Sequence, residues 1–505
     1  MKEKIIHARE YRETLLRDPY RPMYHFTVPD DFGYPADPNG AFFVDGVYHL
    51  MYLYVNSATG ANHWGHISSV DLLHWRHHPD ALTDLDGDEG CYSGGAFLDE
   101  DKTAYLTFWK FPGVDKESDP GGIAIAHAKP PYEEWTRMDS LAVTSSLIWG
   151  VADLEVDGEV LHLACADPSN IWKMNGRYYM QAGNLLVLSN FGKGVEADEK
   201  YKGDFTDLFR SDNLRKWEYA GRFYANTKKG IDDYPDVSED DMCPSFLPLY
   251  DSEENGEPTG KYMQLFISHK RGCQYYIGTL TGETFLPEIH GRMSWCDKAC
   301  FAPEALVDDR NRHIMWAWLQ DNPENDFERY GWTGVYSAPR TLWYAEGELK
   351  MAPVRELEQL EYAHIAYTAE DGETIRVENG ESCRIRAVFR GQEKAGLAVR
   401  VSENGEEYTE IYYSPQEQKL IMDTTRSGSD GWRIREEAPF ALREGEKLHL
   451  DILVDKSVVE VYANQRQAIC RRIYPTHPEQ SRGVKLLGER PITLDTWAMF
   501  ASNPY

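Results

Sequence analysis

The chain reads Ser69-Val70-Asp71-Leu72-Leu73-His74-Trp75 and repeats this pattern as Ser211-Asp212-Asn213-Leu214-Arg215-Lys216-Trp217. Each copy follows a segment of strand character, Gly65 to Ser68 before the first and Phe205 to Arg210 before the second, and a looser version runs from His127 to Trp135. A strand, a short turn and a Trp that return at intervals along the chain are typical of radially repeated sheets. The repeat predicts a β-propeller.

The N-terminal part is otherwise rich in strand signals. A helical pattern from Ala8 to Arg17 predicts a short lead-in within residues 1–20. Runs of β-branched and aromatic residues then recur between Gly, Asp and Asn turns, at 41–54, 103–109, 122–127, 171–182, 262–268 and 313–318. Many short strands with frequent turns indicate a sandwich, a barrel or a propeller, and the repeat favours the propeller.

The pattern changes near residues 351–354, and residues 356–362 read as a short linking helix. Shorter strands with alternating apolar and polar residues follow, at 383–389, 395–401, 408–413, 448–454 and 458–462. Such alternation suits an antiparallel β-sandwich with one solvated face per sheet. We therefore expect a propeller over residues 1–350, a linker over 351–365 and a β-sandwich over 366–505.

Length and charge narrow the function. A chain of 505 residues suggests about two or three domains. The formal net charge of −30 repels nucleic acid phosphates and anionic lipids. We expect a neutral small molecule, such as an oligosaccharide, as the partner, and neither nucleic acid nor a membrane. A homo-oligomer stays open.

The compartment and the cofactor are also constrained. The N-terminus has no apolar signal segment, and nowhere do about 18 apolar residues run uninterrupted. The eight Cys are scattered and complete no zinc spacing, so we expect reduced thiols in a cytoplasmic protein. The sequence has no His-Glu-x-x-His spacing, no Gly-x-Ser-x-Gly elbow and no phosphate loop. We expect no metal and no cofactor.

Two aspartates stand out as candidates for chemistry. Asp37 lies in Tyr34-Pro35-Ala36-Asp37-Pro38-Asn39-Gly40, and Asp167 lies in Cys165-Ala166-Asp167-Pro168-Ser169-Asn170. A following Pro favours extended dihedrals and fixes the direction of each carboxylate. Cleavage of a glycosidic bond needs two carboxyl groups facing each other across that bond. Asp-Pro-Asn-Gly is also a good β-turn sequence, so the local sequence leaves both interpretations open.

The order of segments resembles glycoside hydrolase family 32, the family of invertases, inulinases and levanases. The resemblance covers nearly the whole chain, with Asp167-Pro168 where the family has Arg-Asp-Pro and Cys243-Pro244 where it has Glu-Cys-Pro. The other matching segments are Arg21-Pro22-Met23-Tyr24-His25-Phe26, Asp37-Pro38-Asn39-Gly40, Gly46-Val47-Tyr48-His49-Leu50, Trp64-Gly65-His66, Asp71-Leu72-Leu73-His74-Trp75, Tyr92-Ser93-Gly94-Gly95-Ala96, Gly331-Trp332-Thr333-Gly334, Pro339-Arg340 and Leu448 to Asn464.

The resemblance implies an all-β fold, a five-bladed β-propeller followed by a C-terminal β-sandwich. It also implies a retaining β-fructofuranosidase, in which a fructosyl group is carried by an Asp nucleophile and released by water. Asp37 matches the nucleophile, and Asp167 matches the acid that binds the furanose hydroxyls and stabilises the transition state. The positions expected to contact the substrate are Asn39, Trp64, Tyr92 and Ser93.

The sequence departs from the family pattern at the site itself. Ala36 stands in place of Asn, Leu53 lies near the position of a Gln, Ala166 stands in place of Arg, and Met242 replaces the acid/base Glu. Each change removes a polar group, and each lost hydrogen bond to a buried hydroxyl costs about 1–3 kcal/mol. Ordinary sucrose or inulin is therefore not the expected preferred substrate, and we expect a β-fructofuranoside or a modified, cyclic or related furanoside that suits the altered pocket.

A hydrolase needs a substitute for the missing acid. Asp241 is one residue from the family position, but a one-residue shift in a strand reverses the face, so a bulge must aim it inward. The alternative interpretation of Glu239-Asp240-Asp241 is a solvated acidic loop. Glu304, in Phe301-Ala302-Pro303-Glu304, is the second candidate. Either acid would need a raised pKa to hold a proton near neutral pH.

Three functions follow from these residues. The preferred one is a retaining exo-acting furanosidase. The second is a carbohydrate-binding homologue that lost its acid with Met242. The third is a transferase that passes the sugar to another sugar, because its first half-reaction is the same.

Overall fold

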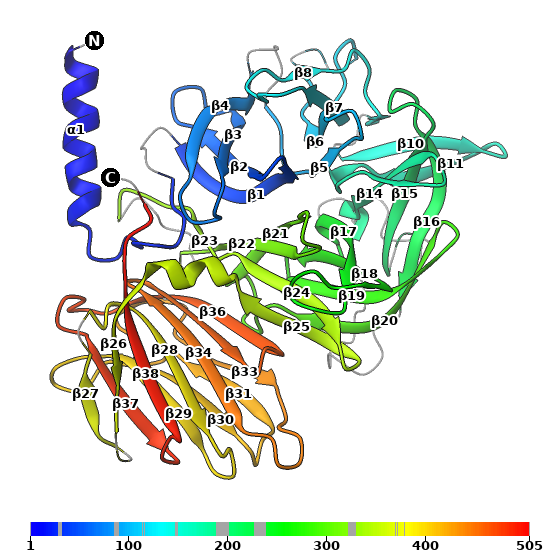
Figure 1. Ribbon diagram of the computed structural model, residues 1–505. Coiled ribbons are helices and arrows are strands. Elements are labelled where there is room, and N and C mark those ends of the chain that lie inside the picture. Colours follow the sequence, from blue (N-terminus) through cyan, green and yellow to red (C-terminus); the bar gives the residue numbers. More distant parts are fainter. Residues whose placement is uncertain are drawn as a thin grey trace.

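Two β-sheet domains follow one helix along the chain (Figure 1). The computed structural model describes residues 2–28, 33–84, 90–113, 115, 117–146, 150–187, 201, 203–226, 239–321, 330–368, 370, 372–377 and 379–503. Helix α1 (Lys2–Arg17) stands at the edge of the molecule and is mostly exposed. No helix within these residues is both long and apolar enough to cross a bilayer.

Five antiparallel sheets of four or five strands form the blades of the propeller. Blade 1 holds β1 (Gly33–Val44), β2 (Val47–Asn56), β3 (Asn62–Ser69) and β4 (Arg76–Leu82). Blade 2 holds β5 (Ala96–Leu98), β6 (Ala104–Lys110), β7 (Gly122–Ala128), β8 (Thr136–Arg137) and β9 (Val143–Thr144). Blade 3 holds β12 (Ala166–Pro168), β13 (Trp172–Met174), β14 (Arg177–Gly183), β15 (Asp204–Ser211) and β16 (Glu218–Asn226).

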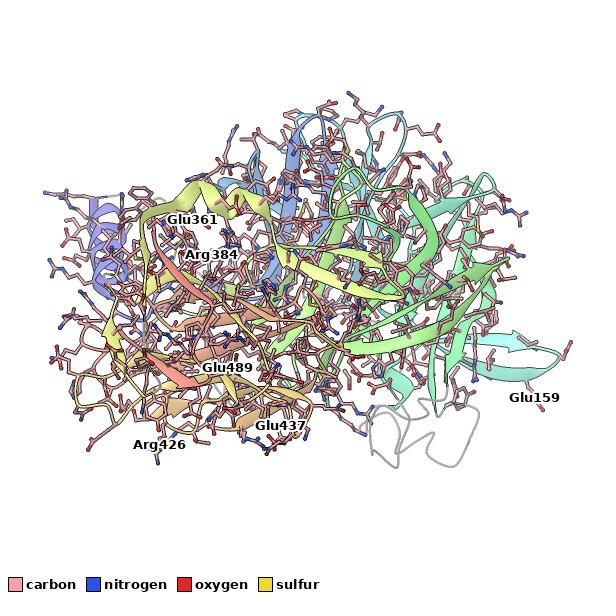
Figure 2. All side chains as sticks on the ribbon, turned by 60° about the horizontal axis from the view of Figure 1, so that its bottom comes forward. Glu159, Glu361, Arg384, Arg426, Glu437 and Glu489 are labelled. Carbon is pink, nitrogen blue, oxygen red and sulfur yellow. The ribbon has the colours of Figure 1, made fainter. Side chains whose placement is uncertain are left out.

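Blade 4 holds β17 (Met242–Tyr250), β18 (Pro258–Ser268), β19 (Gly272–Thr281) and β20 (Thr284–Arg292). Blade 5 holds β21 (Cys300–Val307), β22 (His313–Leu319), β23 (Val335–Tyr336), β24 (Arg340–Ala345) and β25 (Glu348–Pro353). The hairpin of β10 (Val151–Val156) and β11 (Glu159–Ala164) lies between blades 2 and 3, with Glu159 at its projecting tip (Figure 2). A 3-10 turn, Leu185–Val187, follows β14.

The repeat noted in the sequence is the turn between the third and fourth strands of a blade. Asp71 in blade 1 and Asn213 in blade 3 each accept two following backbone N–H groups at 2.9–3.0 Å. The next residues, Leu72 and Leu214, have positive φ angles of 65° and 63°, and Tyr132 in the looser copy has 63°. The repeat therefore arises because an Asp or Asn side chain caps the same left-handed turn in blades 1 and 3.

The N-terminal segment joins the last blade. Thr27 forms a β-bridge with Val335, and the N–H of Tyr336 donates to the carbonyl of Phe26 at 3.1 Å. The first strands of the blades contact one another, β1 with β5 and β21, and β17 with β12 and β21. They surround the centre of the propeller (Figure 1).

The C-terminal domain is a sandwich of two antiparallel sheets. One sheet contains β26 (Glu361–Ala366), β28 (Ser382–Phe389), β32 (Asp430–Gly431), β34 (Leu448–Asp455), β35 (Val458–Ala463), β36 (Gln467–Tyr474) and β38 (Thr493–Met499). The other contains β27 (Thr374–Arg376), β29 (Ala395–Val401), β30 (Thr409–Ser414), β31 (Lys419–Asp423), β33 (Arg435–Pro439) and β37 (Gly483–Gly488). These two domains confirm the predicted all-β fold.

The boundary between the domains is short. Strand β25 ends at Pro353, a 3-10 helix spans Arg355–Leu360, and β26 already belongs to the sandwich. The segment 351–365 thus contains the end of β25, this helix and most of β26.

The sequence predicted one solvated face for each sheet of the sandwich, but β35 and β36 are buried on both faces. Their outer face lies against the propeller, where Glu460 of β35 pairs with Arg340 of β24.

A buried ionic network joins the two domains. His25 lies between two carboxylates of the sandwich, with Nδ1 at 2.9 Å from Asp455 and Nε2 at 3.3 Å from Glu460. The guanidinium of Arg340 lies 3.1 Å from the other oxygen of Glu460. All four side chains are inaccessible to solvent. Burial alone would lower the pKa of His25, but the hydrogen bonds to Asp455 and Glu460 raise it to about 9.

This network predicts an alkaline loss of stability. The stabilisation that protonated His25 adds to the free energy of unfolding is fully present below its ordinary pKa of 6.5. It is lost as the pH rises through about 9. Burial opposes ionisation of Asp455 and Glu460, but His25 holds the pKa of both carboxyls below their ordinary values, so their contribution is lost on acidification instead. We expect His25→Gln to flatten the fall in melting temperature between pH 6.5 and 9, measured by calorimetry. Parallel wild-type and variant curves would contradict this assignment.

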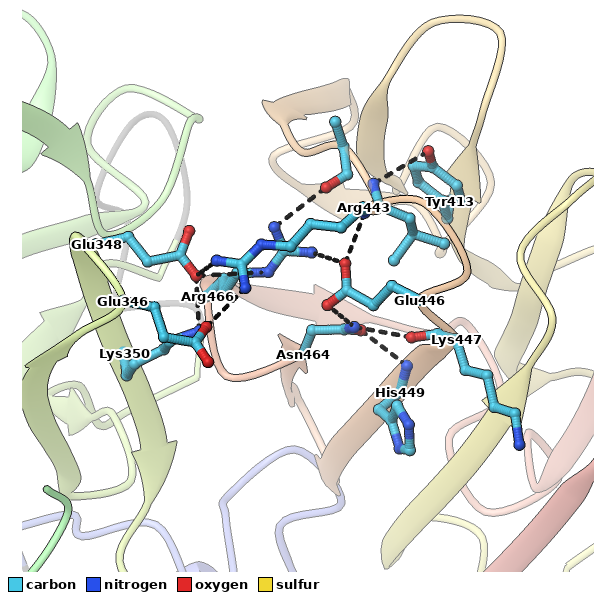
Figure 3. A network of polar contacts seen from close by, with 12 residues as sticks. Glu346, Glu348, Lys350, Tyr413, Arg443, Glu446, Lys447, His449, Asn464 and Arg466 are labelled. Atoms are coloured by element: carbon cyan, nitrogen blue, oxygen red, sulfur yellow. Dashed lines mark hydrogen bonds and ion pairs between the residues drawn. The ribbon is translucent and has the colours of Figure 1, made fainter.

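A second network joins the domains at the surface (Figure 3). Arg443 of the sandwich pairs with Glu346 and Glu348 beside the β24–β25 hairpin at 2.6 and 2.9 Å, and Lys350 pairs with the same two carboxylates. Arg443 is half exposed, so solvent screens its charge. We expect Arg443→Ala to leave the unfolding midpoint unchanged in a denaturant titration. A clear drop would show that this surface network holds the domains together.

Candidate active site

Asp37 lies on β1 where the strand is irregular. The pairing of β1 with β2 shifts between Pro35 and Pro38, and such a bulge re-aims a side chain. The Ser93 hydroxyl donates to Oδ2 of Asp37 at 2.6 Å. Burial raises the pKa of Asp37, although Ser93, Cys243 and the charge of His269 favour the ionised form. This is a partly buried carboxylate held in one direction.

Asp167 on β12 meets Asp37 beside a single sulfur atom. Sγ of Cys243 lies 3.5 Å from Oδ2 of Asp167 and 3.7 Å from Oδ2 of Asp37. Asp167 and Cys243 both have positive φ angles, 36° and 48°, at irregular points of β12 and β17. Burial, and then the charge of Asp37, raise the pKa of Asp167 to about 7. The structure therefore brings together the two aspartates that precede a proline.

The acidic run before β17 is buried, so it is not the solvated loop considered as an alternative. Each acid has a different partner. Glu239 pairs with Arg271, Asp240 with His269, and Asp241 with the hydroxyl of Tyr224. The candidate Asp241 thus faces a buried tyrosine of β16. The charge of its neighbour Asp240 contributes to the raised pKa of Asp167.

Glu304 lies on β21, buried against the backbone of β1. Its carboxyl accepts its neighbour Ala305 N–H at 3.0 Å, and the N–H groups of Gly40 and Ala41 also stabilise its ionised form. Burial nevertheless raises its pKa to about 8. Within the described part of the chain, the Glu304 carboxyl is held by these backbone N–H groups of β21 and β1. The side chain supports β1 just beyond the predicted nucleophile.

The expected substrate-contacting residues divide into two pairs. Ser93 binds Asp37 directly, and the half-buried Tyr92 lies close enough for Asp167 and Asp37 to add to the effect of burial and raise its pKa. Trp64 and Asn39 are fully buried. Trp64 donates to the carbonyl of Tyr92 at 3.2 Å, and Oδ1 of Asn39 accepts the N–H of Gly94 at 3.1 Å. The second pair positions the segment that carries the first.

The departures from the family pattern are packed as apolar residues. Leu53, Ala166 and Met242 are all buried, and Ala36 packs against the core. Met242 lies against Gly183 at the end of β14, where even one added methyl group would clash with its sulfur. These positions have no polar group to offer a sugar.

His269 was not singled out in the sequence, where Ser268-His269-Lys270-Arg271-Gly272 reads as an ordinary polar turn between strands. The structure places it at the site, with Nδ1 2.5 Å from Oδ2 of Asp240 and with 49% of its side chain exposed. Burial lowers the pKa of His269, but the hydrogen bond to Asp240 and the charges of Asp240, Asp167 and Asp37 outweigh it and raise the pKa. The carboxylates around His269 thus favour its protonated form.

Metal chemistry has no ligand set in the described part of the chain. No group of three or more His, Cys, Asp or Glu side chains there could hold a metal ion.

The chain is similar to known proteins in sequence and in fold. In sequence, the chain is 28% identical to a sucrose-6-phosphate hydrolase of Zymomonas mobilis, over 91% of this chain and 88% of that protein. It is 27% identical to a levanase of Bacillus subtilis, over 92% of this chain and 68% of that protein. In structure, it is similar to fructan 1-exohydrolase IIa from Cichorium intybus, with a TM-score of 0.76 and 20% identity over 96% of this chain and 98% of that one.

The family models cover both domains. The model of the glycosyl hydrolases family 32 N-terminal domain matches residues 25–353, and that of the family 32 C-terminal domain matches residues 356–495. The first match contains all five blades and every site residue described above. This protein belongs to glycosyl hydrolase family 32.

Proposed function

We propose that this glycosidase hydrolyses a β-fructofuranoside, or a related furanoside, with retention of configuration at the anomeric carbon. The observation that carries the proposal is the meeting of Asp37 and Asp167 beside Cys243 in a partly buried site. The names of the relatives, sucrose-6-phosphate hydrolase and levanase, support a fructose-containing substrate.

Asp37 is proposed as the nucleophile. Its carboxylate attacks the anomeric carbon, the bond to the leaving oxygen breaks, and water later releases the sugar from the carboxylate. The attacking group must be ionised, and burial opposes this. Ser93, Cys243 and His269 supply the hydrogen bonds and charge that favour the ionised form.

Asp167 is proposed to hold furanose hydroxyls and to stabilise positive charge on the ring in the transition state. With a pKa raised to about 7, it can donate as well as accept a hydrogen bond near neutral pH. Asp37 and Asp167 repel each other when both are ionised. The positive charge of a developing oxocarbenium ion relieves that repulsion, which favours the transition state over the ground state.

The substrate is proposed to differ from plain sucrose or inulin. Leu53, Ala166 and Met242 replace polar groups with buried apolar ones, so fewer furanose hydroxyls find partners. A cyclic difructose anhydride or another modified furanoside, which presents fewer free hydroxyls, fits such a site better. An exo-acting mode on open-chain fructosides and a cytoplasmic location are part of the proposal. The eight cysteines are buried thiols, which is compatible with that location.

The test is a screen of furanosides with detection of the released sugar. Sucrose, inulin, levan and cyclic difructose anhydrides are each incubated with the protein, and the anomer first released is identified by NMR. From an open-chain fructoside we expect fructose to be released as the β-anomer. We expect a difructose anhydride to be preferred, and its first cleavage to open the ring and give a disaccharide of fructose. Binding without release from any of them would favour the carbohydrate-binding alternative, and transfer to an added sugar would favour the transferase.

A further inference from the structure

The proposed site has a nucleophile, Asp37, and a stabilising acid, Asp167. It still needs a proton donor, because Met242 stands where the family has its acid/base Glu. The donor must lie near Asp37, hold a proton at neutral pH and reach solvent-exposed substrate. Asp241 is fully buried against Tyr224, and Glu304 is buried against β1. His269 is the titratable side chain that combines half exposure with an acidic partner at the site.

The pairing of β17 with β18 places His269 beside the residues that come just before Cys243. Met242 pairs with Ile267 across β17 and β18, so continuing this antiparallel register two residues further brings Asp240 opposite His269. The carbonyl of Asp240 accepts the N–H of Asn184 at 2.6 Å. Asn184 follows Gly183, the partner of Ala166 on β12. Asp240 therefore sits between the turn that carries His269 and the strand that carries Asp167.

The His269 ring is oriented by its neighbours. Asp240 is 97% buried. Its carboxylate accepts a hydrogen bond from Nδ1 of His269, and its two oxygens lie 3.2 and 3.3 Å from the backbone N–H of the same residue. The ring also packs edge-on against Phe301, with ring centroids 5.7 Å apart. Because Asp240 occupies Nδ1, a proton passed to substrate must leave from Nε2. The carboxylate fixes both the tautomer and the direction of the ring, as in other His–carboxylate pairs.

We propose that His269, positioned by Asp240, is the general acid and base of this enzyme in place of the glutamate that its family carries at the position of Met242. This inference rests on the proposed function. In the first step Asp37 bonds to the anomeric carbon, the electron pair of the broken bond stays on the leaving oxygen, and that oxygen takes the proton from Nε2. In the second step neutral Nε2 takes a proton from water as the water oxygen attacks the anomeric carbon and Asp37 departs as a carboxylate.

The charges around His269 suit this cycle. The charged groups that raise the pKa of His269 are Asp240 before β17, Asp167 on β12 and Asp37 on β1. When Asp37 is consumed in the covalent intermediate, one negative charge near the imidazolium disappears. The imidazolium then becomes a stronger acid and the neutral ring persists as a base, as the second step requires.

The test compares two leaving groups. Fructosyl fluoride loses fluoride without needing a proton, whereas a fructoside with an alkoxide leaving group needs one. For His269→Gln we expect kcat/KM to fall about 10²- to 10⁴-fold on the fructoside. On fructosyl fluoride kcat/KM should change little, because it reports the first step, whereas kcat should fall because the second step still needs the base. Added imidazole should restore part of the activity of His269→Ala. The alkaline limb of the pH profile, which reports the acid, should disappear in His269→Gln and move to lower pH in Asp240→Asn.

His364→Gln is the matched control. His364 forms a similar half-exposed pair with Asp495 at 2.8 Å, on the sandwich, and its replacement should leave both rates unchanged. If His269→Gln keeps the wild-type rate on the fructoside, or loses both rates equally while folded, the general-acid role is overturned. If that variant does not fold, Asp240→Asn and its pH profile decide. Failure of the wild type to release sugar from any furanoside or fluoride would instead overturn the proposed function.

Discussion

Asp37→Asn should abolish sugar release, lowering kcat by on the order of 10⁴-fold or more, while the protein stays folded. The amide is nearly the same size as the carboxylate, so the contacts with Ser93 and Cys243 can be kept. An amide oxygen is a poor nucleophile and a poor leaving group, so neither half-reaction can proceed through it. Fructosyl fluoride should be affected as strongly as a fructoside, unlike in the His269 variants.

The stability of this variant is informative as well. Burial raises the pKa of Asp37, which means that the folded protein disfavours its ionised form at neutral pH. The neutral amide removes this penalty and the repulsion with Asp167. We therefore expect an unchanged or higher melting temperature, measured by calorimetry beside the activity assay.

The control is Asp45→Asn, in the turn that follows β1. Asp45 is exposed and pairs with Lys102 at 2.8 Å, so its replacement should leave turnover intact. Residual turnover in Asp37→Asn at the wild-type level would show that another group attacks the sugar. Loss of sugar binding together with turnover would favour a role for Asp37 in recognition only.

The sequence was informative where the chain obeys a local rule. The Asp71 and Asn213 turns were visible as a repeat because the same side-chain cap is used twice. Asp37 and Asp167 were visible because a proline follows each of them, but the φ angle of 36° at Asp167 is not the extended backbone that the proline predicts. Their approach to one another could not be derived from the residues alone, because it depends on the closure of blades that are distant in sequence.

The acid could not be chosen from the sequence for a physical reason. Asp241 and Cys243 have positive φ angles, 46° and 48°, so the regular alternation of faces fails where the candidates lie. Counting residues from Met242 therefore could not distinguish Asp240 from Asp241. His269 sits in a turn whose polar residues would be equally at home in solvent, and only the register of β17 with β18 brings it to the site.

The second large effect is expected far from the sugar, at Glu460. Its carboxylate accepts the N–H of Ala338 at 2.8 Å and the hydroxyl of Tyr462 at 2.7 Å, besides its pairs with His25 and Arg340. Glu460→Ala leaves two buried cations without their shared counter-charge. Removing one partner of a buried ionic group typically costs about 3–5 kcal/mol. We expect a loss of that size in the unfolding free energy, measured by denaturant titration.

Glu460→Gln separates charge from shape, because it keeps the side-chain volume and an acceptor for Ala338 while removing the negative charge. A loss close to that of Glu460→Ala would assign the effect to the charge, and a much smaller loss would assign it to packing. A loss as small as that of Arg443→Ala would contradict a stabilising role. The active site should respond too, because Ala338 and Arg340 closely follow Tyr336 in the chain. Burial, and then the charge of Asp37, raise the pKa of Tyr336, so this tyrosine lies near the proposed nucleophile. The sandwich thus stabilises the blade that lies beside the proposed nucleophile. On warming, Glu460→Ala should therefore lose activity at a lower temperature than the wild type.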